Sequence, residues 1–190
     1  MNVSDAVTSR TSIRAFLDTP VTEADLRSIL ETSRWAPSGG NTQPWRVYGL
    51  SGESMHTFKS LLAEDLAANP VGDAMEFPMY PAEIKEPYRT RRFKCGEDMY
   101  GTINIPREDK FGRLMNFARN FEFFGAPAAL FFAIDRQMGP GQWAHLGMLM
   151  QTIALVAQER GLSTCMQEFW MMRHKLVRSF YAIPDELMVY

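Results

Sequence analysis

The sequence has few of the residues that disulfide, metal or nucleophilic chemistry requires. Its 190 residues include two cysteines, Cys95 and Cys165, and three histidines, all scattered and without the spacing of metal ligands. Neither a disulfide framework, nor a zinc site, nor a Cys-His nucleophile pair is indicated. The nearest approach to a membrane helix is the apolar run Ala126 to Ile134, which falls short of the roughly 18 residues needed. We therefore expect no metal and no membrane contact.

A strong excess of charge is also absent. The formal net charge of -2 gives no general reason to expect nucleic acid as a partner. The first residues, Met1 to Asp5, have neither the basic nor the apolar region of a secretory signal, so we expect a cytoplasmic protein. The apolar content of 46% and the length predict a single domain over residues 1–190 with one substantial core.

Common fingerprints of phosphate binding and acyl transfer are missing as well. The chain has no Gly-x-Gly-x-x-Gly after a strand, no Gly-x-x-x-x-Gly-Lys-[Ser/Thr] and no Gly-x-Ser-x-Gly. A Rossmann site, a P-loop and a hydrolase nucleophile elbow are therefore not supported. A phosphate ligand would need another kind of cradle.

The chain does have clear helix and strand patterns. A pair resembling a capping box, Thr22 and Asp25, opens an amphipathic stretch that stops at Pro37. The apolar run Ala128 to Ile134 predicts a central strand covered on both faces. The patterns predict helices at about 22–36, 55–68, 114–124, 142–160 and 172–181, and strands at 45–50, at 128–134 and from 187 onward. The helix at 142–160 is apolar over most of its circumference, which favours a place in the core or at a subunit interface.

Residues 69–113 interrupt this regularity. Prolines at 70, 78, 81, 87 and 106 break the pattern, and a cationic run extends from Arg89 to Lys94. We interpret the segment as an excursion from the core. It is also a candidate lid over a substrate, because a long irregular segment is more often functional or mobile than a simple spacer. The cationic run is typical either of a solvated face or of a contact with phosphate or an acidic partner.

Three polar segments are candidates for chemistry. Arg10 and Arg14 lie four residues apart with hydroxyls between them, which suits a phosphate clamp or a solvated arginine pair. The loop from Pro37 to Trp45 is rich in turn-forming and hydrogen-bonding residues, which is typical of a ligand-binding loop or of a plain helix-to-strand connection. The segment Thr164 to Trp170 places Gln167 and Glu168 among apolar neighbours, and this pair alone is also compatible with a strand end.

Together, these segments resemble the flavin-dependent nitroreductase family. Arg10-Thr11-Ser12-Ile13-Arg14-Ala15-Phe16 is similar to the family's Arg-x-Ser-x-Arg-x-Phe. Ala36 to Trp45 resembles Ala-Pro-Ser-x-x-Asn-x-Gln-Pro-Trp, and Gly161 through Glu168 resembles Gly-Leu-x(5)-Glu. The three occur in the family's order, and the resemblance covers nearly the whole chain.

The resemblance implies an α+β fold with a mixed, largely antiparallel sheet flanked by helices. It also implies a homodimer that binds FMN at the subunit interface. Arg10, Ser12 and Arg14 would bind the FMN phosphate and ribityl tail, with backbone contacts from Thr11. The other implied flavin contacts are Pro37, Ser38, Gly39, Asn41 and, more weakly, Gln43, often from the opposite subunit; Met166, Gln167 and Glu168 at the other face or edge of the ring; and Asn120.

The implied activity is that of an FMN-dependent oxidoreductase. It would use NADH or NADPH to reduce nitroaromatic or quinone-like acceptors in a ping-pong cycle through flavin N5. The flavin would carry the redox chemistry, so no residue is assigned as catalytic. Four aromatic residues of the excursion would line or cover the cavity: Phe77, Tyr80, Tyr88 and Phe93.

Other functions stay open. The same fold would suit a flavin dehalogenase or a dehydrogenase acting on another small molecule. A flavin- or anion-binding dimer without turnover belongs to a different class, and a nucleic-acid module built on Arg89 to Lys94 is more distant.

Two departures from the family pattern affect these expectations. Family members usually continue past the position of Tyr190, where they complete the last strand, supply a further basic contact to the FMN phosphate and extend a tail across the partner subunit. Phe169 stands where some members have glycine beside the flavin, so we expect different ring contacts there.

Overall fold

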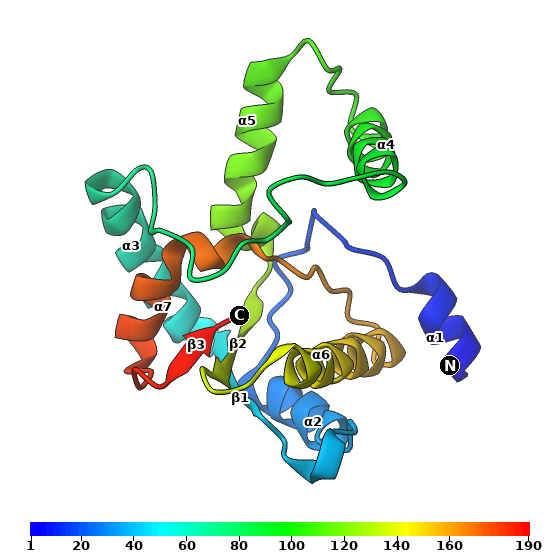
Figure 1. Ribbon diagram of the computed structural model, residues 1–190, viewed down its shortest axis with the longest axis vertical. Coiled ribbons are helices and arrows are strands. Elements are labelled where there is room, and N and C mark those ends of the chain that lie inside the picture. Colours follow the sequence, from blue (N-terminus) through cyan, green and yellow to red (C-terminus); the bar gives the residue numbers. More distant parts are fainter.

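A three-stranded antiparallel sheet lies at the centre of the computed structural model, which describes residues 1–190 (Figure 1). The strands are ordered β1-β2-β3, with Tyr48 opposite Phe131 and Ile134 opposite Met188. The elements are α1 (Val3–Ser9), α2 (Glu23–Ser33), η1 (Gly39–Asn41), β1 (Trp45–Ser51), α3 (Gly52–Ala68), α4 (Tyr88–Thr102), α5 (Lys110–Ala118), η2 (Arg119–Gly125), β2 (Ala128–Asp135), α6 (Pro140–Glu159), η3 (Phe169–Arg173), α7 (His174–Tyr181) and β3 (Leu187–Val189). The expected α+β class is confirmed. All pairings within the sheet are antiparallel, and the only parallel pairing is an isolated bridge between Ser12 and Thr164.

Helices cover both faces of the sheet, as the apolar run of β2 predicted. Successive side chains of a strand point to opposite faces. Phe131 accordingly packs with Phe58 and Val177 in the layer of α3 and α7. Leu130 instead packs with Ile153 in the layer of α2 and α6 (Figure 1). The result is a three-layer body with the sheet in the middle.

The predicted helix boundaries have local causes that the structure confirms. The Thr22 hydroxyl accepts a hydrogen bond from the Asp25 N–H at 3.2 Å, and the Thr22 N–H donates to the Asp25 carboxylate at 2.8 Å. These bonds form the capping box of α2. The Thr22 hydroxyl also donates to the Asp25 carboxylate at 2.7 Å, and this bond, followed by the bond from the Thr22 N–H, lowers the pKa of Asp25. Pro140 opens α6, and Gly161, with φ of +76°, follows its end in the left-handed conformation that glycine adopts without strain.

The excursion at 69–113 contains more regular structure than the sequence predicted. Residues 69–87 are irregular, but the cationic run lies on helix α4, which corrects the expectation of a continuous loop. The helix has no buried residue, so no apolar stripe marked it in the sequence. Arg113 of α5 holds it instead, with two bonds of 2.7 and 3.0 Å to the Glu97 carboxylate. α4 and α5 stand together at one end of the molecule (Figure 1).

Two other boundaries differ from the sequence prediction. The helix expected to run to residue 124 ends at Ala118, and a 3-10 segment follows in which Phe123 and Phe124 both have φ of +53°. The last helix begins at His174, after another 3-10 turn. No helix has both the length and the apolar character needed to cross a bilayer.

Candidate functional site

Two backbone hydrogen bonds hold the arginine segment, residues 10–16, one to the segment that follows α6 and one to η2. The Ile13 N–H donates to the Thr164 carbonyl at 3.0 Å, and the Phe16 N–H donates to the Phe124 carbonyl at 3.1 Å. The first bond accompanies the bridge between Ser12 and Thr164. The structure therefore brings together the first and third of the three polar segments, which are about 150 residues apart in the sequence.

The polar side chains of the arginine segment have no hydrogen-bond or ion-pair partner within the chain. Arg27, Arg113 and Arg173 all form ion pairs, whereas neither Arg10 nor Arg14 forms an ion pair or a hydrogen bond through its guanidinium. The hydroxyls of Thr11 and Ser12 are exposed and also make no hydrogen bond. A segment with two free guanidinium forks and two free hydroxyls suits an anion with several oxygens.

The neighbouring segment adds free backbone donors. The N–H groups of Cys165, Met166, Gln167 and Glu168 lie outside regular structure and donate to no acceptor in the chain. Fixed N–H groups of this kind suit ring carbonyl oxygens and aromatic nitrogen atoms. We call residues 10–14 and 165–168 together the donor cradle. Its two parts fit a flat ligand that has hydrogen-bond acceptors at one end and an anionic group at the other.

A third arginine, which no sequence pattern indicated, adjoins the cradle. The Arg14 guanidinium carbon lies 6.0 Å from the ring centroid of Phe124, and that of Arg119 lies 5.6 Å from the same centroid. Arg119 also has no ion pair. The Phe124 ring itself follows a sharp turn through left-handed backbone at Phe123 and Phe124, a turn that non-glycine residues rarely make.

The side chains of Gln167 and Asn120, both expected near the ring, are bonded to each other. The Gln167 Nε2 donates to the Asn120 Oδ1 at 2.9 Å. Phe169, the departure from the family pattern, turns its ring inward against Phe117 and Phe121, with centroid distances of 4.9 and 4.5 Å. Met166 and Glu168 are exposed.

The loop from Pro37 to Gln43 has the opposite character, because its polar groups are bonded to one another and to α6. Ser38 Oγ accepts from the Gln43 N–H at 3.0 Å, and the Gln43 Nε2 donates to the Asn41 Oδ1 at 2.9 Å. Left-handed backbone at Gly40, Asn41 and Gln43 gives the loop its tight course. The residues that were expected near a ring are thus held in a fixed conformation.

A histidine of α6 supports this loop. His145 Nδ1 lies 3.0 Å from the Gln142 Oε1, which also accepts from the Thr42 hydroxyl at 3.0 Å. The Nε2 atom of the same ring accepts the Gly39 N–H at 3.3 Å. Both ring nitrogen atoms therefore take part in tying the loop to α6. A Cβ at Gly39 would lie 3.0 Å from His145 Cε1, so a larger residue there would have to displace the imidazole ring.

Within one chain, the loop and the donor cradle are far apart. The loop bonds to α6 at His145, whereas the Gln158 side chain of the same helix bonds to Ser9, next to the arginine segment, at 3.2 Å. Thirteen residues of α-helix separate these two contacts, a rise of about 20 Å. The structure therefore does not bring Pro37, Ser38, Gly39, Asn41 and Gln43 to the other predicted site residues.

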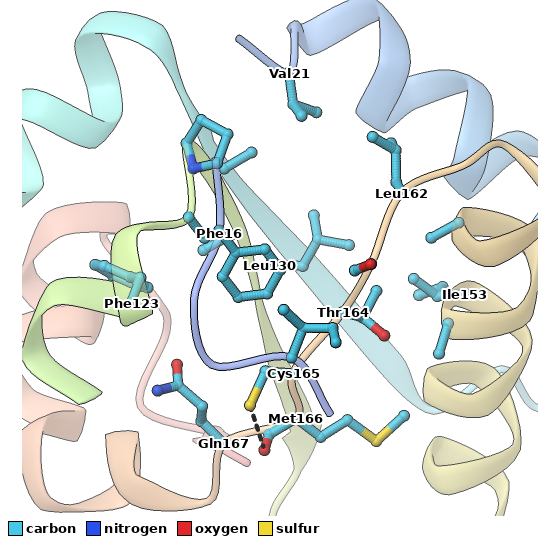
Figure 2. Close-up of a pocket in the computed structure, with 18 of the residues that line it drawn as sticks. Phe16, Val21, Phe123, Leu130, Ile153, Leu162, Thr164, Cys165, Met166 and Gln167 are labelled. Atoms are coloured by element: carbon cyan, nitrogen blue, oxygen red, sulfur yellow. Dashed lines mark hydrogen bonds between the residues drawn. The ribbon is translucent and has the colours of Figure 1, made fainter. Parts of the chain in front are cut away.

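One of two cavities adjoins the donor cradle, because Ile13, Cys165, Met166 and Gln167 line it as well. A cavity of about 460 Å³ is a mostly apolar slot along β2, lined by residues such as Phe16, Leu130, Ile153 and Leu162 and bordered by Gln167 (Figure 2). β3 pairs only with Ala133 to Asp135, so the rest of this edge of β2 faces the slot. A second cavity of about 410 Å³ is more polar and lies at the loop, between Arg34 and Gln43.

The expected aromatic lining lies elsewhere. Phe77 packs against Trp143 and Tyr190, Arg92 stacks over Tyr80 at 4.3 Å, and Arg107 stacks over Phe93 at 5.0 Å. Tyr88 is exposed. None of the four lines either cavity. Their role above a substrate stays a prediction.

Comparison with known proteins agrees with the arrangement of the segments. Residues 7–190 match the model of the Nitroreductase family. The chain is 37% identical to nitrobenzene nitroreductase of Ectopseudomonas oleovorans, over 98% of this chain and 82% of the relative. It is also 37% identical to 4-nitrobenzoate reductase of Pseudomonas putida, over 94% of this chain and 78% of the relative.

A solved structure is also closely similar. The FMN and NADPH-dependent nitroreductase NfnB of Sphigopyxis sp. strain HMH superposes with a TM-score of 0.94 and 38% identity, over 100% of this chain and 85% of that protein. The three segments, the fold and these relatives lead to one conclusion: the chain belongs to the nitroreductase family.

Proposed function

We propose that the protein is an FMN-dependent oxidoreductase that uses NADPH or NADH to reduce nitroaromatic compounds. Family membership supports the reaction class. The similar proteins named above act on nitrobenzene and 4-nitrobenzoate, and the similar solved structure is that of an FMN and NADPH-dependent enzyme. When bound, FMN would supply the redox chemistry by passing a hydride equivalent from the nicotinamide to the acceptor.

The observation that carries the proposal is the donor cradle. Arg10 and Arg14 provide forked cationic donors without a partner in the chain, and these suit the FMN phosphate. Ser12 and Thr11 add neutral donors to the same group. The N–H groups of Met166, Gln167 and Glu168 face no internal acceptor, so they are available to the edge of the flavin ring. Fixed N–H dipoles at that edge favour negative charge there, and a donor of this kind typically contributes about 3 kcal/mol to a transition state.

Arg119 extends the cationic end of the cradle. It flanks the Phe124 ring together with Arg14 and has no acidic partner. A third guanidinium near a phosphate or a nicotinamide dinucleotide strengthens the attraction for anions in a site of partly low dielectric.

We also propose that the working unit is a homodimer in which the loop of one subunit completes the cradle of the other. The support is the distance of about 20 Å along α6 that separates the two regions within one chain. A second copy related by a twofold axis would bring each loop to the opposite cradle. Exposed apolar residues are available to cover such an interface, among them Val3, Val7, Trp35 and Met148.

The test begins with the purified chain and added FMN. We expect retained FMN with a flavin absorption band, bleaching of that band by NADPH or NADH under anaerobic conditions, and its return when nitrobenzene or 4-nitrobenzoate is added. A protein that folds but retains no FMN would overturn the proposal. Bound FMN that neither nicotinamide reduces would restrict the chain to flavin binding.

A further inference from the structure

A chain of hydrogen bonds with only one possible direction runs from Trp170 through the Gln167 side chain to Phe117, and we call it the relay. The Trp170 Nε1 donates to the Gln167 Oε1 at 3.0 Å, and the Gln167 Nε2 donates to the Asn120 Oδ1 at 2.9 Å. The Asn120 Nδ2 then donates to the Phe117 carbonyl at 2.7 Å. An indole N–H can only donate and a backbone carbonyl can only accept, so neither amide can be reversed without the loss of a bond.

Both ends of this relay are anchored in the folded body. The Trp170 ring is buried, stacks on Phe123 with centroids 4.5 Å apart, and meets Phe131 edge-on at 5.3 Å. At the other end, Phe117 belongs to the last turn of α5. Gln167 therefore joins the buried aromatic core to the end of a helix that comes from a distant part of the sequence.

The main chain around Gln167 has little other support. Residues 165–168 lie outside helices and strands, and none of their N–H groups donates to the chain. The only backbone bond to their carbonyl groups is a long one, from the Met171 N–H to the Glu168 carbonyl at 3.4 Å. The Gln167 side chain is consequently the principal hydrogen-bonded restraint on the direction in which these N–H groups point.

We propose that Gln167 is a positioning residue for the flavin, acting through the relay from Trp170 to Phe117. This inference rests on the proposed FMN function and deepens it. The Gln167 side chain does not touch the cofactor in this role. It holds the backbone N–H groups of Met166, Gln167 and Glu168 in the orientation that the ring edge requires. Donors held in place before the reaction lose no energy to reorientation during it, and small misplacements are costly.

Three substitutions separate the relay from simple packing. Gln167→Met keeps the length of the side chain and removes both polar ends. Gln167→Glu keeps an acceptor for Trp170 but sets a carboxylate against the Asn120 Oδ1, so Asn120 must turn and release the Phe117 carbonyl. Trp170→Phe removes the indole N–H while an aromatic ring stays in the core. Gln137→Met serves as the matched control, because Gln137 is exposed and its side chain makes no hydrogen bond.

The first measurement needs no cofactor. In the FMN-free protein, the indole N–H proton resonance of Trp170 should move upfield in Gln167→Met and stay in place in Gln137→Met. In the FMN-loaded protein, we expect Gln167→Met to slow flavin reduction by NADPH about tenfold, the effect of one or two lost neutral hydrogen bonds. The KM for NADPH and the Kd for FMN should change less than about threefold, because the phosphate contacts stay.

The outcomes distinguish the inference from the function on which it rests. A shifted indole resonance with a reduction rate within twofold of the parent would overturn the positioning role. An unshifted resonance would show that the relay itself is not formed. The double variant Gln167→Met/Trp170→Phe should be no slower than Gln167→Met, since both changes break the same relay; additive losses would contradict this. If the unaltered protein binds no FMN, the proposed function fails, while the resonance test still reports on the relay.

Discussion

The donor cradle and the loop from Pro37 to Gln43 contain similar kinds of residue and use them in opposite ways. In the loop, the polar groups of Ser38, Gly39 and Gln43 bond to the loop itself or to His145. In the cradle, Arg10 and Arg14 have no partner, and neither have four successive backbone N–H groups. A polar group satisfied inside the chain gives shape, whereas an unsatisfied one is available to a ligand.

The donor cradle and the loop therefore have different tasks. Ligand affinity should reside mainly in the cradle, because its charged donors gain most from an anion. The loop should act through its shape, by holding a fixed surface against a ligand that the cradle has bound. A loop of this kind affects the reaction more than the retention of the cofactor. Substitutions in the two regions separate these tasks, and we expect the largest effect in the cradle.

The double substitution Arg10→Ala/Arg14→Ala should weaken FMN binding at least about a hundredfold, since each charge-assisted bond to phosphate contributes about 1.5–3 kcal/mol. The measurement is the quenching of FMN fluorescence on titration with protein. Arg46→Ala is the matched control, because Arg46 is exposed on β1 and has no ion pair. A change of less than threefold in the double variant would show that the cradle does not bind the phosphate.

Mixing two defective proteins tests whether loop and cradle meet across a dimer. We expect Arg10→Ala/Arg14→Ala and Asn41→Ala each to have low activity. When they are unfolded, mixed equally and refolded, half of the dimers are hybrids in which one of two sites is intact, so about a quarter of the parental activity should return. Light scattering would establish the dimer. No recovery in a mixture that contains hybrids would indicate that the loop serves the site of its own chain or none.

Ser38→Ala removes the acceptor of the Gln43 N–H and should loosen the loop. The expected result is a roughly tenfold slower reduction of bound flavin with an FMN Kd changed less than about threefold, because one neutral hydrogen bond is lost and no charge is altered. Stopped-flow absorbance gives the rate and fluorescence titration gives the Kd. Ser60→Ala, whose hydroxyl bonds to a carbonyl of its own helix, is the control. Equal losses in rate and affinity would contradict the division of tasks.

The smallest expected effect is on the rate of alkylation of Cys165, a cradle residue that also lines the apolar cavity. Burial raises the pKa of the Cys165 thiol, and nearby Arg14 opposes this rise to a smaller extent. Because the thiolate is the reactive form, we expect iodoacetamide at pH 8 to modify exposed Cys95 about tenfold faster. Arg14→Ala removes the opposing charge, so the pKa should rise further and alkylation of Cys165 should slow by a few-fold. Mass spectrometry of the two peptides measures both rates, and faster alkylation of Cys165 in the variant would reverse the assigned sign.

Much of the fold could be read from the sequence because its signals are local. The capping box at Thr22 and Asp25, the apolar run of β2 and the glycine after α6 each act within a few residues. Helix α4 gave no such signal. Its residues are polar and none is buried, so its place depends on Arg113 from another helix. The turn at Phe123 and Phe124 was also hidden, since nothing in two phenylalanines indicates left-handed backbone.

The three polar segments were found in the sequence, but their relations were not. The sequence by itself determined which residue types are present at which spacing, and through the family resemblance it determined the fold class and the reaction class. Only the tertiary structure decided that Ile13 bonds to Thr164 and that the Gln167 amide is held between Trp170 and Asn120. It also decided that the loop and the cradle lie far apart along the length of α6. The physical reason is range: capping and periodicity act over a few residues, whereas hydrogen bonds across 40 to 150 residues form only once the layers have packed.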